Sequence, residues 1–161
     1  MTTLVVYKKI LSGGCWFERL KDGLSWNDLS FGRSKSVLRK YDSPSPYQIM
    51  AKFPDLIRVV EDVTSRRIIG TWFNLYENGD HYTPWHQDKY GVDCAIVSFG
   101  GERTFLLKPK NGGGKSESYL MEDGDVMIFP EAINLTHVHS VPKSSTLKSP
   151  RISILFFLGD A

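Results

Sequence analysis

Hydrophobic positions follow two different periods along the chain. In the first third, apolar side chains recur at helical spacing over about Gly14 to Gly23 and over Pro54 to about Val63, where the proline suits a first helical turn. From Arg67 onward, short runs rich in β-branched and aromatic residues alternate with turn residues, a pattern typical of strands. These runs are Ile68 to Tyr76, Ala95 to Phe99, Thr104 to Leu107, Ser118 to Met121, Val126 to Phe129, Leu135 to Val141 and Arg151 to Leu158. The pattern predicts two helices followed by about seven strands.

The connections between the predicted strands are short and rich in turn residues, as in 111–114 (Asn-Gly-Gly-Gly) and 122–125 (Glu-Asp-Gly-Asp). Strands and helices do not alternate, which argues against parallel βαβ units. We therefore expect a mostly β fold with flanking helices. It would have a double-stranded β-helix, or jelly-roll, core over about residues 67–158, after a helical region over about residues 1–66. Residues 1–161 are expected to form a single domain.

The composition is that of an ordinary globular protein, with 41% hydrophobic and 24% charged residues. No run of about 18 apolar residues is present, and the N-terminal segment lacks the order of a secretory signal. The two cysteines, Cys15 and Cys94, are too few for a disulfide framework. We therefore expect an intracellular protein, in the cytoplasm or nucleus, that does not associate with a membrane.

The net charge is +2, which is too small to indicate nucleic-acid binding by itself. Positive residues nonetheless gather in two places along the chain. They are Arg33, Lys35, Arg39 and Lys40 in the N-terminal third, and Lys108, Lys110 and Lys115 around the glycine-rich turn. Such clusters either follow the phosphates of a nucleic acid or form a solvated face, and the sequence leaves both interpretations open.

The motif His86-Gln87-Asp88, followed much later by His139, is the strongest chemical signal in the sequence. On an extended strand residues i and i+2 point the same way, so we expect His86 and Asp88 to chelate one ion while Gln87 turns aside. Two imidazoles and one carboxylate on one face of a metal leave the opposite face open, as in non-haem Fe(II) oxygenases. The motif predicts oxidation at iron, although a bare H-x-D is more often a solvated loop.

Several further segments occur in one order around this motif. They are residues 74–79 (Asn-Leu-Tyr-Glu-Asn-Gly), 98–100 (Ser-Phe-Gly), 124–126 (Gly-Asp-Val), 139–142 (His-Ser-Val-Pro) and 150–151 (Pro-Arg). This order resembles the AlkB family of Fe(II)/2-oxoglutarate dioxygenases, over about Trp16 to Phe157. The resemblance implies Fe(II) as the metal, 2-oxoglutarate as the cosubstrate and O₂ as the oxidant.

The second imidazole has two candidates, because His137 and His139 are two residues apart and would face the same way on a strand. The frame His-Ser-Val-Pro-Lys resembles the family's distal-ligand segment and favours His139 over His137 as the metal ligand. His137 would then line the cavity or hydrogen-bond to it. His81 lies in a polar turn and is expected to be exposed.

The resemblance also implies which residues hold 2-oxoglutarate. In the family an Asn-x-Tyr segment and a later Arg bind it, which here gives Asn74, Tyr76 and Arg151. The chemistry agrees, because a planar guanidinium pairs with a carboxylate through two hydrogen bonds. The alternative for Arg151 is a surface charge at a strand end. A second family Arg, six residues later, is replaced by Phe157, so the pocket closes without that charge, binds the cosubstrate more weakly, or has reduced activity.

In the family the N-terminal region forms a lid over a nucleic-acid substrate. By resemblance, Phe31 would fill the gap left by an extruded base, and Tyr47 or Ile49 would stack on the base. Arg39 would contact the nucleic-acid backbone. The alternative for the apolar residues is packing within the lid. Tyr90 stands where family members that act on alkylated bases often carry an acid that reads the base, which leaves base preference open.

We therefore expect an Fe(II)/2-oxoglutarate-dependent dioxygenase that oxidatively demethylates N-alkylated nucleobases in DNA or RNA, held as a single strand or as a flipped base. The protein is expected to be a monomer. One alternative is a 2-oxoglutarate-dependent hydroxylase of a protein or small molecule that uses the same site. The other is a metal-binding jelly-roll module with little turnover, an interpretation that Phe157 keeps open.

Overall fold

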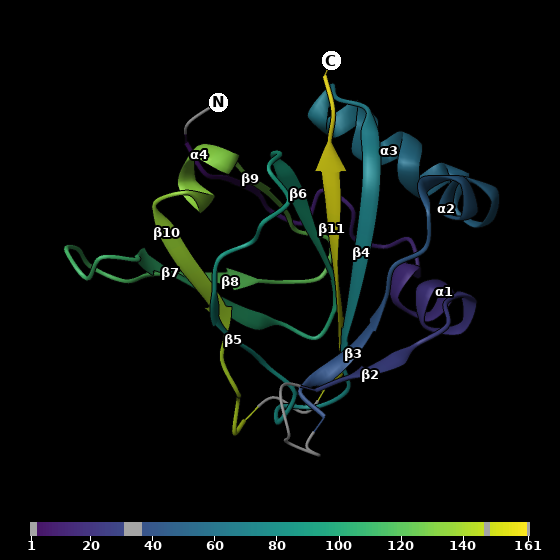
Figure 1. Ribbon diagram of the computed structural model, residues 1–161. Coiled ribbons are helices and arrows are strands. Elements are labelled where there is room, and N and C mark those ends of the chain that lie inside the picture. Colours follow the sequence, from purple (N-terminus) through teal and green to yellow (C-terminus); the bar gives the residue numbers. More distant parts are fainter. Residues whose placement is uncertain (1–2, 31–36, 147–148, 161) are drawn as a thin grey trace.

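A computed structural model of the chain describes residues 3–30, 37–146 and 149–160, and two β-sheets form its centre (Figure 1). The larger, major sheet has the strand order β1-β9-β6-β11-β4-β3-β2, and the minor sheet has the order β5-β10-β7-β8. The strands of the major sheet are β1 (Val5–Tyr7), β2 (Asn27–Leu29), β3 (Arg39–Asp42), β4 (Ile68–Tyr76), β6 (Cys94–Gly100), β9 (Val126–Phe129) and β11 (Arg151–Leu158). Those of the minor sheet are β5 (Thr83–His86), β7 (Arg103–Pro109), β8 (Glu117–Met121) and β10 (His137–Val141).

The paired strands are antiparallel, and the chain crosses repeatedly from one sheet to the other. Between β4 and β11, strands β4, β6, β9 and β11 enter the major sheet, while β5, β7, β8 and β10 enter the minor sheet. This connectivity is that of a double-stranded β-helix, or jelly roll. The predicted fold class is therefore confirmed.

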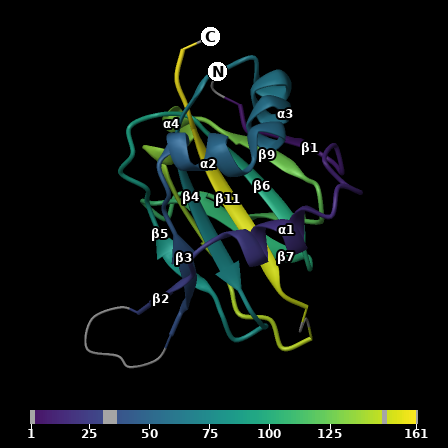
Figure 2. The same cartoon turned by 90° about the vertical axis from the view of Figure 1, so that its right-hand side faces the viewer.

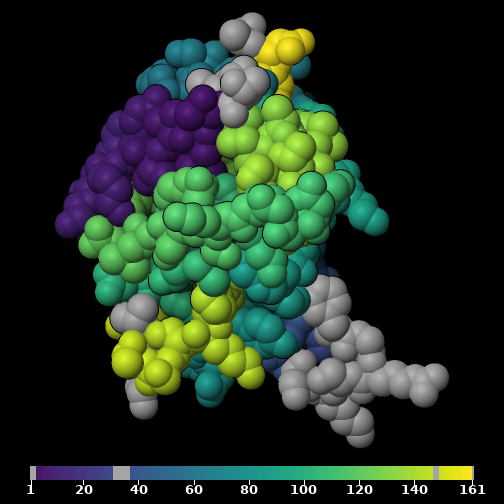
Figure 3. Space-filling view, turned by 90° about the vertical axis from the view of Figure 1, so that its left-hand side faces the viewer, coloured from purple at the N-terminus to yellow at the C-terminus, as the bar shows by residue number. Residues whose placement is uncertain are grey.

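Helices cover the outer face of the major sheet (Figure 2). The helices α1 (Trp16–Gly23), α2 (Pro46–Lys52) and α3 (Pro54–Thr64) share one core with this face, whereas the short α4 (Glu131–Asn134) contacts β10. On the opposite side of the molecule, β7 and β8 run across the middle of the exposed surface (Figure 3). Among the described residues, no helix is both long and apolar enough to cross a membrane.

Successive residues of the two central strands, β4 and β11, point alternately to the hydrophobic core under the helices and to a polar space between the two sheets. Every second residue of β11 from 152 to 156 is fully buried against the helical layer. The residues between them face the minor sheet, and the register pairs Arg151 with Tyr76 and Ser153 with Asn74. The two-residue period of a strand thus gathers polar side chains from β4 and β11 on the face between the sheets.

The predicted helices and strands are all present, with boundaries that differ by a few residues. The strand expected from Leu135 begins instead at His137, because Leu135 ends the short helix α4. The hydrophobic pattern does not predict β1, β2, β3 or β5. These strands are three or four residues long, and polar residues such as Asp28 and Lys40 interrupt any apolar alternation.

The helix α2 is also absent from the predictions, although its sequence carries a local signal for a helix start. The Ser45 hydroxyl accepts a hydrogen bond from the Gln48 amide, and the Gln48 side chain accepts one from the Ser45 amide, which together form a capping box. Pro46 occupies the first turn, where its missing N–H costs nothing. The helix has only seven residues, so its apolar period is too short to show.

The N-terminal region places the predicted lid residues differently from the expectation. Phe31, the predicted wedge, lies outside the described residues, as do Arg33 and Lys35. Tyr47 is 90% exposed on α2, within the helical layer, whereas Ile49 on the same helix is 0% exposed in the core beneath it. The prediction that Ile49 stacks on a base is therefore wrong, because a fully buried side chain has no free face.

Two substitutions on α2 test this difference. Ile49→Ala is expected to lower the free energy of unfolding by about 2–5 kcal/mol, because it removes buried methyl groups and leaves a cavity. Tyr47→Ala is expected to change it by less than about 0.5 kcal/mol, since the ring is exposed. Urea unfolding followed by circular dichroism measures both values. A loss below about 1 kcal/mol for Ile49→Ala would contradict the core position of this residue.

Candidate active site

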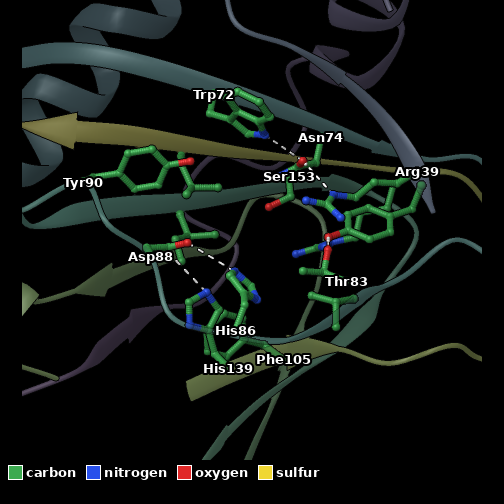
Figure 4. A pocket seen from close by; sticks show the side chains of 15 residues that line it. Arg39, Trp72, Asn74, Thr83, His86, Asp88, Tyr90, Phe105, His139 and Ser153 are labelled. Atoms are coloured by element: carbon green, nitrogen blue, oxygen red, sulfur yellow. Dashed lines mark hydrogen bonds and ion pairs between the residues drawn. The ribbon is translucent and has the colours of Figure 1, made fainter. Parts of the chain in front are cut away.

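Three possible metal-binding side chains meet between the two sheets. His86 ends β5, Asp88 follows it, and His139 lies on β10 directly across from His86 in the strand register. The ring centroids of the two imidazoles are 4.1 Å apart. The Asp88 carboxylate lies between their Nε2 atoms, with its oxygens 3.2 Å from that of His86 and 3.4 Å from that of His139. Figure 4 shows the three side chains converging on one point.

These distances fit a single metal ion. One ligating atom from each residue lies within 4.8 Å of the others. Ligands held at about 2.1 Å from a metal and at right angles to each other are roughly 3 Å apart, close to the two N–O distances found here. Two neutral nitrogens and one carboxylate oxygen are also the donor set of non-haem Fe(II) sites. The arrangement can therefore hold such an ion with small adjustments of the side chains.

The position of Asp88 corrects one element of the sequence analysis. Strand β5 ends at His86, so Asp88 is not on the same extended strand, and strand alternation does not aim it. Instead the side chain of Asn134 holds this segment: its Oδ1 accepts from the Asp88 amide at 3.0 Å, and its Nδ2 donates to the Asp88 carbonyl at 2.7 Å. Gln87 does turn aside, and its Nε2 donates to the Asn134 carbonyl at 2.7 Å.

Asn134 contacts the candidate site, and sequence reasoning did not identify it. Its side chain is buried, with 2% exposure, at the end of α4. Its only sequence signal is the glycosylation motif Asn134-Leu-Thr136, which points away from a buried role. Because the amide makes two hydrogen bonds to Asp88 in the interior, it is not accessible to a glycan.

Different contacts orient the two imidazoles. The Nδ1 of His86 lies 2.8 Å from the Pro84 carbonyl, which holds the ring with Nε2 directed at the Asp88 carboxylate. The ring of His139 stacks on Phe105, with centroids 5.2 Å apart, and also packs against Phe129. The buried Nδ1 of His139 has no hydrogen-bond partner among the described residues, so aromatic packing and the contact of Nε2 with Asp88 fix this ring.

The protonation states at this site suit metal binding. Burial raises the pKa of the Asp88 carboxyl, but hydrogen bonds from His139 and His86 outweigh burial and hold the pKa well below its usual range. Burial also lowers the pKa of His139, by more than the nearby Asp88 carboxylate raises it. At neutral pH the site therefore presents an ionised carboxylate and a neutral His139, which are the forms that bind a divalent metal.

The alternative distal residue, His137, lies elsewhere. It is half-buried at the start of β10, and its Nδ1 lies 2.8 Å from the Thr136 hydroxyl. It is neither grouped with Asp88 as a possible ligand nor part of the cavity lining. His81 is half-buried rather than exposed, because its Nδ1 accepts a hydrogen bond from the Glu77 amide.

The three predicted cosubstrate residues line the same cavity as the possible metal ligands. Arg151 is 1% exposed, and its Nη2 donates to the Ser98 hydroxyl at 2.7 Å. Its Nε and Nη1 are buried without a hydrogen-bond partner. Burial lowers the pKa of Arg151 to about 10, which leaves the guanidinium charged at neutral pH. The surface alternative for Arg151 is therefore wrong.

Tyr76 lies between two buried arginines. Its ring centroid is 5.4 Å from the Arg151 guanidinium carbon and 5.1 Å from that of Arg103, and its hydroxyl bonds to Thr83 at 2.7 Å. Arg103 differs from Arg151, because its guanidinium donates to the carbonyls of residues 78, 81 and 142. Arg103 therefore ties loops together, whereas Arg151 presents unused donors to the cavity. Neither Thr83 nor Arg103 was predicted from the sequence.

Asn74 accepts two hydrogen bonds through one oxygen. The Nε of Arg39 and the Nε1 of Trp72 each donate to Asn74 Oδ1 at 2.9 Å (Figure 4). Arg39 is 8% exposed and lines the cavity. The prediction that it contacts the nucleic-acid backbone is therefore wrong. Lys40 faces the other way and pairs with Glu77 at 3.3 Å. Alternation along β3 explains the difference, because neighbouring residues of a strand point to opposite faces.

The mouth of the cavity is aromatic. Trp72 and Tyr90 line it, Trp72 stacks on Tyr41 at 4.9 Å, and the ring of Tyr90 lies 4.2 Å from that of Phe157. Burial and the nearby Asp88 charge raise the pKa of Tyr90 to about 12, so this phenol stays protonated. Phe157 follows Arg151 on the inward face of β11, as strand alternation predicts. An apolar ring therefore occupies the position of the family's second Arg.

The fold and the arrangement of these side chains define a non-haem metal oxygenase. The family model of the 2OG-Fe(II) oxygenase superfamily matches residues 15–156, so the chain belongs to that superfamily. This match confirms the predicted metal, Fe(II), and the predicted cosubstrates, 2-oxoglutarate and O₂. The grouped side chains of His86, Asp88 and His139 agree with it.

Three curated relatives carry the name DNA oxidative demethylase ALKBH2. The Bos taurus protein is 25% identical over 127 residues, which cover 71% of this chain and 45% of the relative. The Arabidopsis thaliana protein is 26% identical over 137 residues, 66% of this chain and 44% of the relative. The human protein is 27% identical over 129 residues, 71% of this chain and 48% of the relative. The matched part thus spans less than half the length of these relatives.

Solved structures agree on the fold. The structure of OsALKBH1 has a TM-score of 0.66 at 15% identity and covers 97% of this chain and 96% of its own. The non-heme alpha-ketoglutarate-dependent epimerase SnoN from nogalamycin biosynthesis has a TM-score of 0.65 at 17% identity, with coverage of 98% and 78%. At these identities the likeness shows the jelly-roll fold alone. Within the superfamily, the sequence similarity to the three curated relatives agrees with the predicted resemblance to AlkB proteins.

The two hydrogen bonds from the Asn134 side chain to the Asp88 backbone can be tested by metal binding. Asn134→Ala removes both hydrogen bonds to the Asp88 backbone, so the affinity for Mn(II) is expected to fall by roughly 10- to 100-fold. Thr136→Ala is the matched control, because it destroys the same glycosylation motif without touching Asp88. Titration followed by electron paramagnetic resonance measures free Mn(II). Equal Mn(II) affinities for Asn134→Ala and the unaltered protein would show that these hydrogen bonds do not contribute to metal binding.

Proposed function

We propose that this chain is an Fe(II)/2-oxoglutarate-dependent dioxygenase that removes methyl groups from N-alkylated nucleobases by oxidation. One observation carries the proposal: the Arg151 guanidinium is fully buried, lacks an anionic partner among the described residues, and lines the same cavity as the His86, Asp88 and His139 group. A buried unpaired charge costs several kcal/mol. An anionic ligand bound beside a metal relieves that cost, and 2-oxoglutarate carries two carboxylates.

In this proposal His86, Asp88 and His139 hold Fe(II), and the chain supplies their orientation. Bound Fe(II), with 2-oxoglutarate and O₂, supplies an oxidising power that no side chain possesses. The hydrogen bonds from Asn134 and the packing of Phe105 fix the ligands in advance, which reduces the rearrangement required on metal binding.

Arg151 is assigned to the distal carboxylate of 2-oxoglutarate, with the Tyr76 phenol and the Asn74 amide as further contacts. A guanidinium offers a planar pair of donors to a carboxylate, and Arg151 has two unused donor nitrogens. The Asn74 oxygen is already occupied by Arg39 and Trp72, so its NH₂ group is the remaining donor. These residues orient the cosubstrate, and the burial around them excludes water from it.

The aromatic mouth suits a flat substrate, because Trp72 and Tyr90 offer ring faces for stacking. Oxidation of an N-methyl group gives an N-hydroxymethyl base, which releases formaldehyde, while 2-oxoglutarate becomes succinate and CO₂. The three relatives named DNA oxidative demethylase support a nucleic-acid substrate. The protonated phenol of Tyr90 reads the base edge through a neutral hydrogen bond instead of a charge.

We further propose that residues 1–161 act as one AlkB-like domain, as a monomer inside the cell. Alkylated DNA or RNA occurs there, and a reducing compartment suits both Fe(II) and the free thiols of Cys15 and Cys94.

The central test combines two products. The protein is loaded anaerobically with Fe(II) and 2-oxoglutarate, mixed with methylated oligonucleotides and exposed to air, with His86→Ala as the inactive control. We expect succinate, and oligonucleotides that have lost the mass of a methylene group. Succinate without any change in the oligonucleotides would overturn demethylation and point to a protein or small-molecule hydroxylase. No succinate at all would indicate a metal-binding module with little turnover.

A pair of substitutions on β10 tests the choice of distal ligand. His139→Ala is expected to abolish Mn(II) binding and succinate formation, because it removes a ligand atom that no neighbour can replace. His137→Ala is expected to leave both within about twofold, since that ring lies outside the cavity. Equal losses in the two variants would mean that the assigned ligand is wrong.

The role of Arg151 is tested by cosubstrate binding. Arg151→Lys keeps a positive charge but loses the planar fork, so the affinity for 2-oxoglutarate is expected to fall by about tenfold or more. Calorimetry on the Mn(II)-loaded protein measures it, and the affinity for Mn(II) itself should barely change. An unchanged 2-oxoglutarate affinity would remove Arg151 from the site.

A further inference from the structure

A second buried cation lines the cavity beside Arg151. Arg39, the first residue of β3, is 8% exposed, and its side chain enters the space between the sheets (Figure 4). Its Nε donates to Asn74 Oδ1 at 2.9 Å and its Nη1 to the Tyr82 carbonyl at 3.4 Å. Both partners are neutral, and within residues 3–30, 37–146 and 149–160 no carboxylate forms an ion pair with Arg39. Among the described residues its charge therefore has no carboxylate partner.

The cavity carries more positive than negative charge. Its described lining has two guanidinium groups, those of Arg39 and Arg151, and one carboxylate, that of Asp88. Asp88 is held by both imidazoles and is assigned to the metal. The two guanidinium charges therefore remain for a ligand, and 2-oxoglutarate is a dianion that brings two negative charges. One dicarboxylate thus matches two buried cations.

Strand β11 does not supply the second cation. On this strand Phe157 lies on the same face as Arg151, at the position where the family carries its second Arg. Phe157 packs on Tyr90, and its ring also covers Gly70, where a Cβ atom would lie only 2.7 Å from a ring carbon. The glycine on β4 thus makes the room that the phenyl ring fills. Since this position is apolar, a second charge for the cavity must come from another strand, and β3 supplies it through Arg39.

We propose that Arg39 binds the carboxylate of 2-oxoglutarate next to the keto group, while Arg151 binds the distal one. This inference rests on the proposed function and extends it to a residue on a different strand. Arg39 is positioned for the task in advance, because Asn74 fixes its Nε and is itself fixed by Trp72. The remaining guanidinium donors then face a ligand whose orientation the two arginines determine together.

Two ligands distinguish the roles of the arginines. 2-Oxopentanoate has the keto acid end of 2-oxoglutarate but lacks the distal carboxylate. Arg39→Gln is expected to weaken both ligands by about tenfold or more, since each retains the carboxylate assigned to Arg39. Arg151→Gln is expected to weaken 2-oxoglutarate alone. Calorimetry on the Mn(II)-loaded protein, without O₂, gives the four affinities relative to the unaltered chain.

The neighbouring residue provides a matched control. Lys40→Gln removes the same charge from the same strand, but Lys40 pairs with Glu77 outside the cavity, so both affinities should stay within about twofold. Arg39→Lys tests for a merely structural role, because it keeps the charge and should bind both ligands better than Arg39→Gln. If Arg39→Gln does not fold, as thermal unfolding would show, Arg39→Lys takes its place and should weaken both ligands several-fold.

The outcomes separate this inference from the proposed function. Unaltered affinities for both ligands in the folded Arg39 variant, or a loss confined to 2-oxoglutarate, would overturn the assignment of Arg39. In either case 2-oxoglutarate binding by the unaltered chain would leave the proposed function standing. Failure of the unaltered Mn(II)-loaded chain to bind 2-oxoglutarate would overturn both.

Discussion

The polar layer between the two sheets is held in an unfavourable electrostatic state. Arg151 is almost completely removed from water and donates to the Ser98 hydroxyl, while its Nε and Nη1 have no hydrogen-bond partner among the described residues. Such a group lowers the stability of the unliganded fold by comparison with a paired charge. The surrounding core must offset this cost, and the apolar layer against the helices does so through side chains such as Phe73 and Phe156.

The same separation of layers accounts for the metal site. Cross-strand pairing of β5 with β10 fixes the two imidazoles, while the carboxylate comes from a segment that no strand holds. Asn134 replaces the missing strand pairing with two hydrogen bonds to the Asp88 backbone. The site is therefore built from one rigid pair and one tethered segment, which together would hold a metal ion through three protein ligands.

The sequence predicts the fold because strand runs are local patterns, whereas the candidate site residues come from the H-x-D motif and from the family resemblance. It does not predict Asn134 or the inward direction of Arg39, since both depend on contacts between segments far apart in the chain. The prediction for Ile49 is wrong for a related reason. The face of α2 on which a residue lies decides whether it is buried, and a helix of seven residues is too short for its apolar period to show in the sequence. The short strands β2 and β3 are formed by pairing with β4, directly or in turn, and not by their own composition.

The interior network also links the two ends of the cavity. The Asn74 oxygen accepts from Arg39, at the end assigned to the cosubstrate, and from Trp72, at the aromatic mouth. One amide thus couples the position of a guanidinium to the position of an indole. The bonds from Arg39 and from Trp72 together hold this amide, so each donor contributes to the position of the other. Trp72 also stacks on Tyr41, which lies two residues after Arg39 on the same face of β3. Residues at the interior end of the cavity are therefore joined to its aromatic mouth by hydrogen bonds and ring contacts.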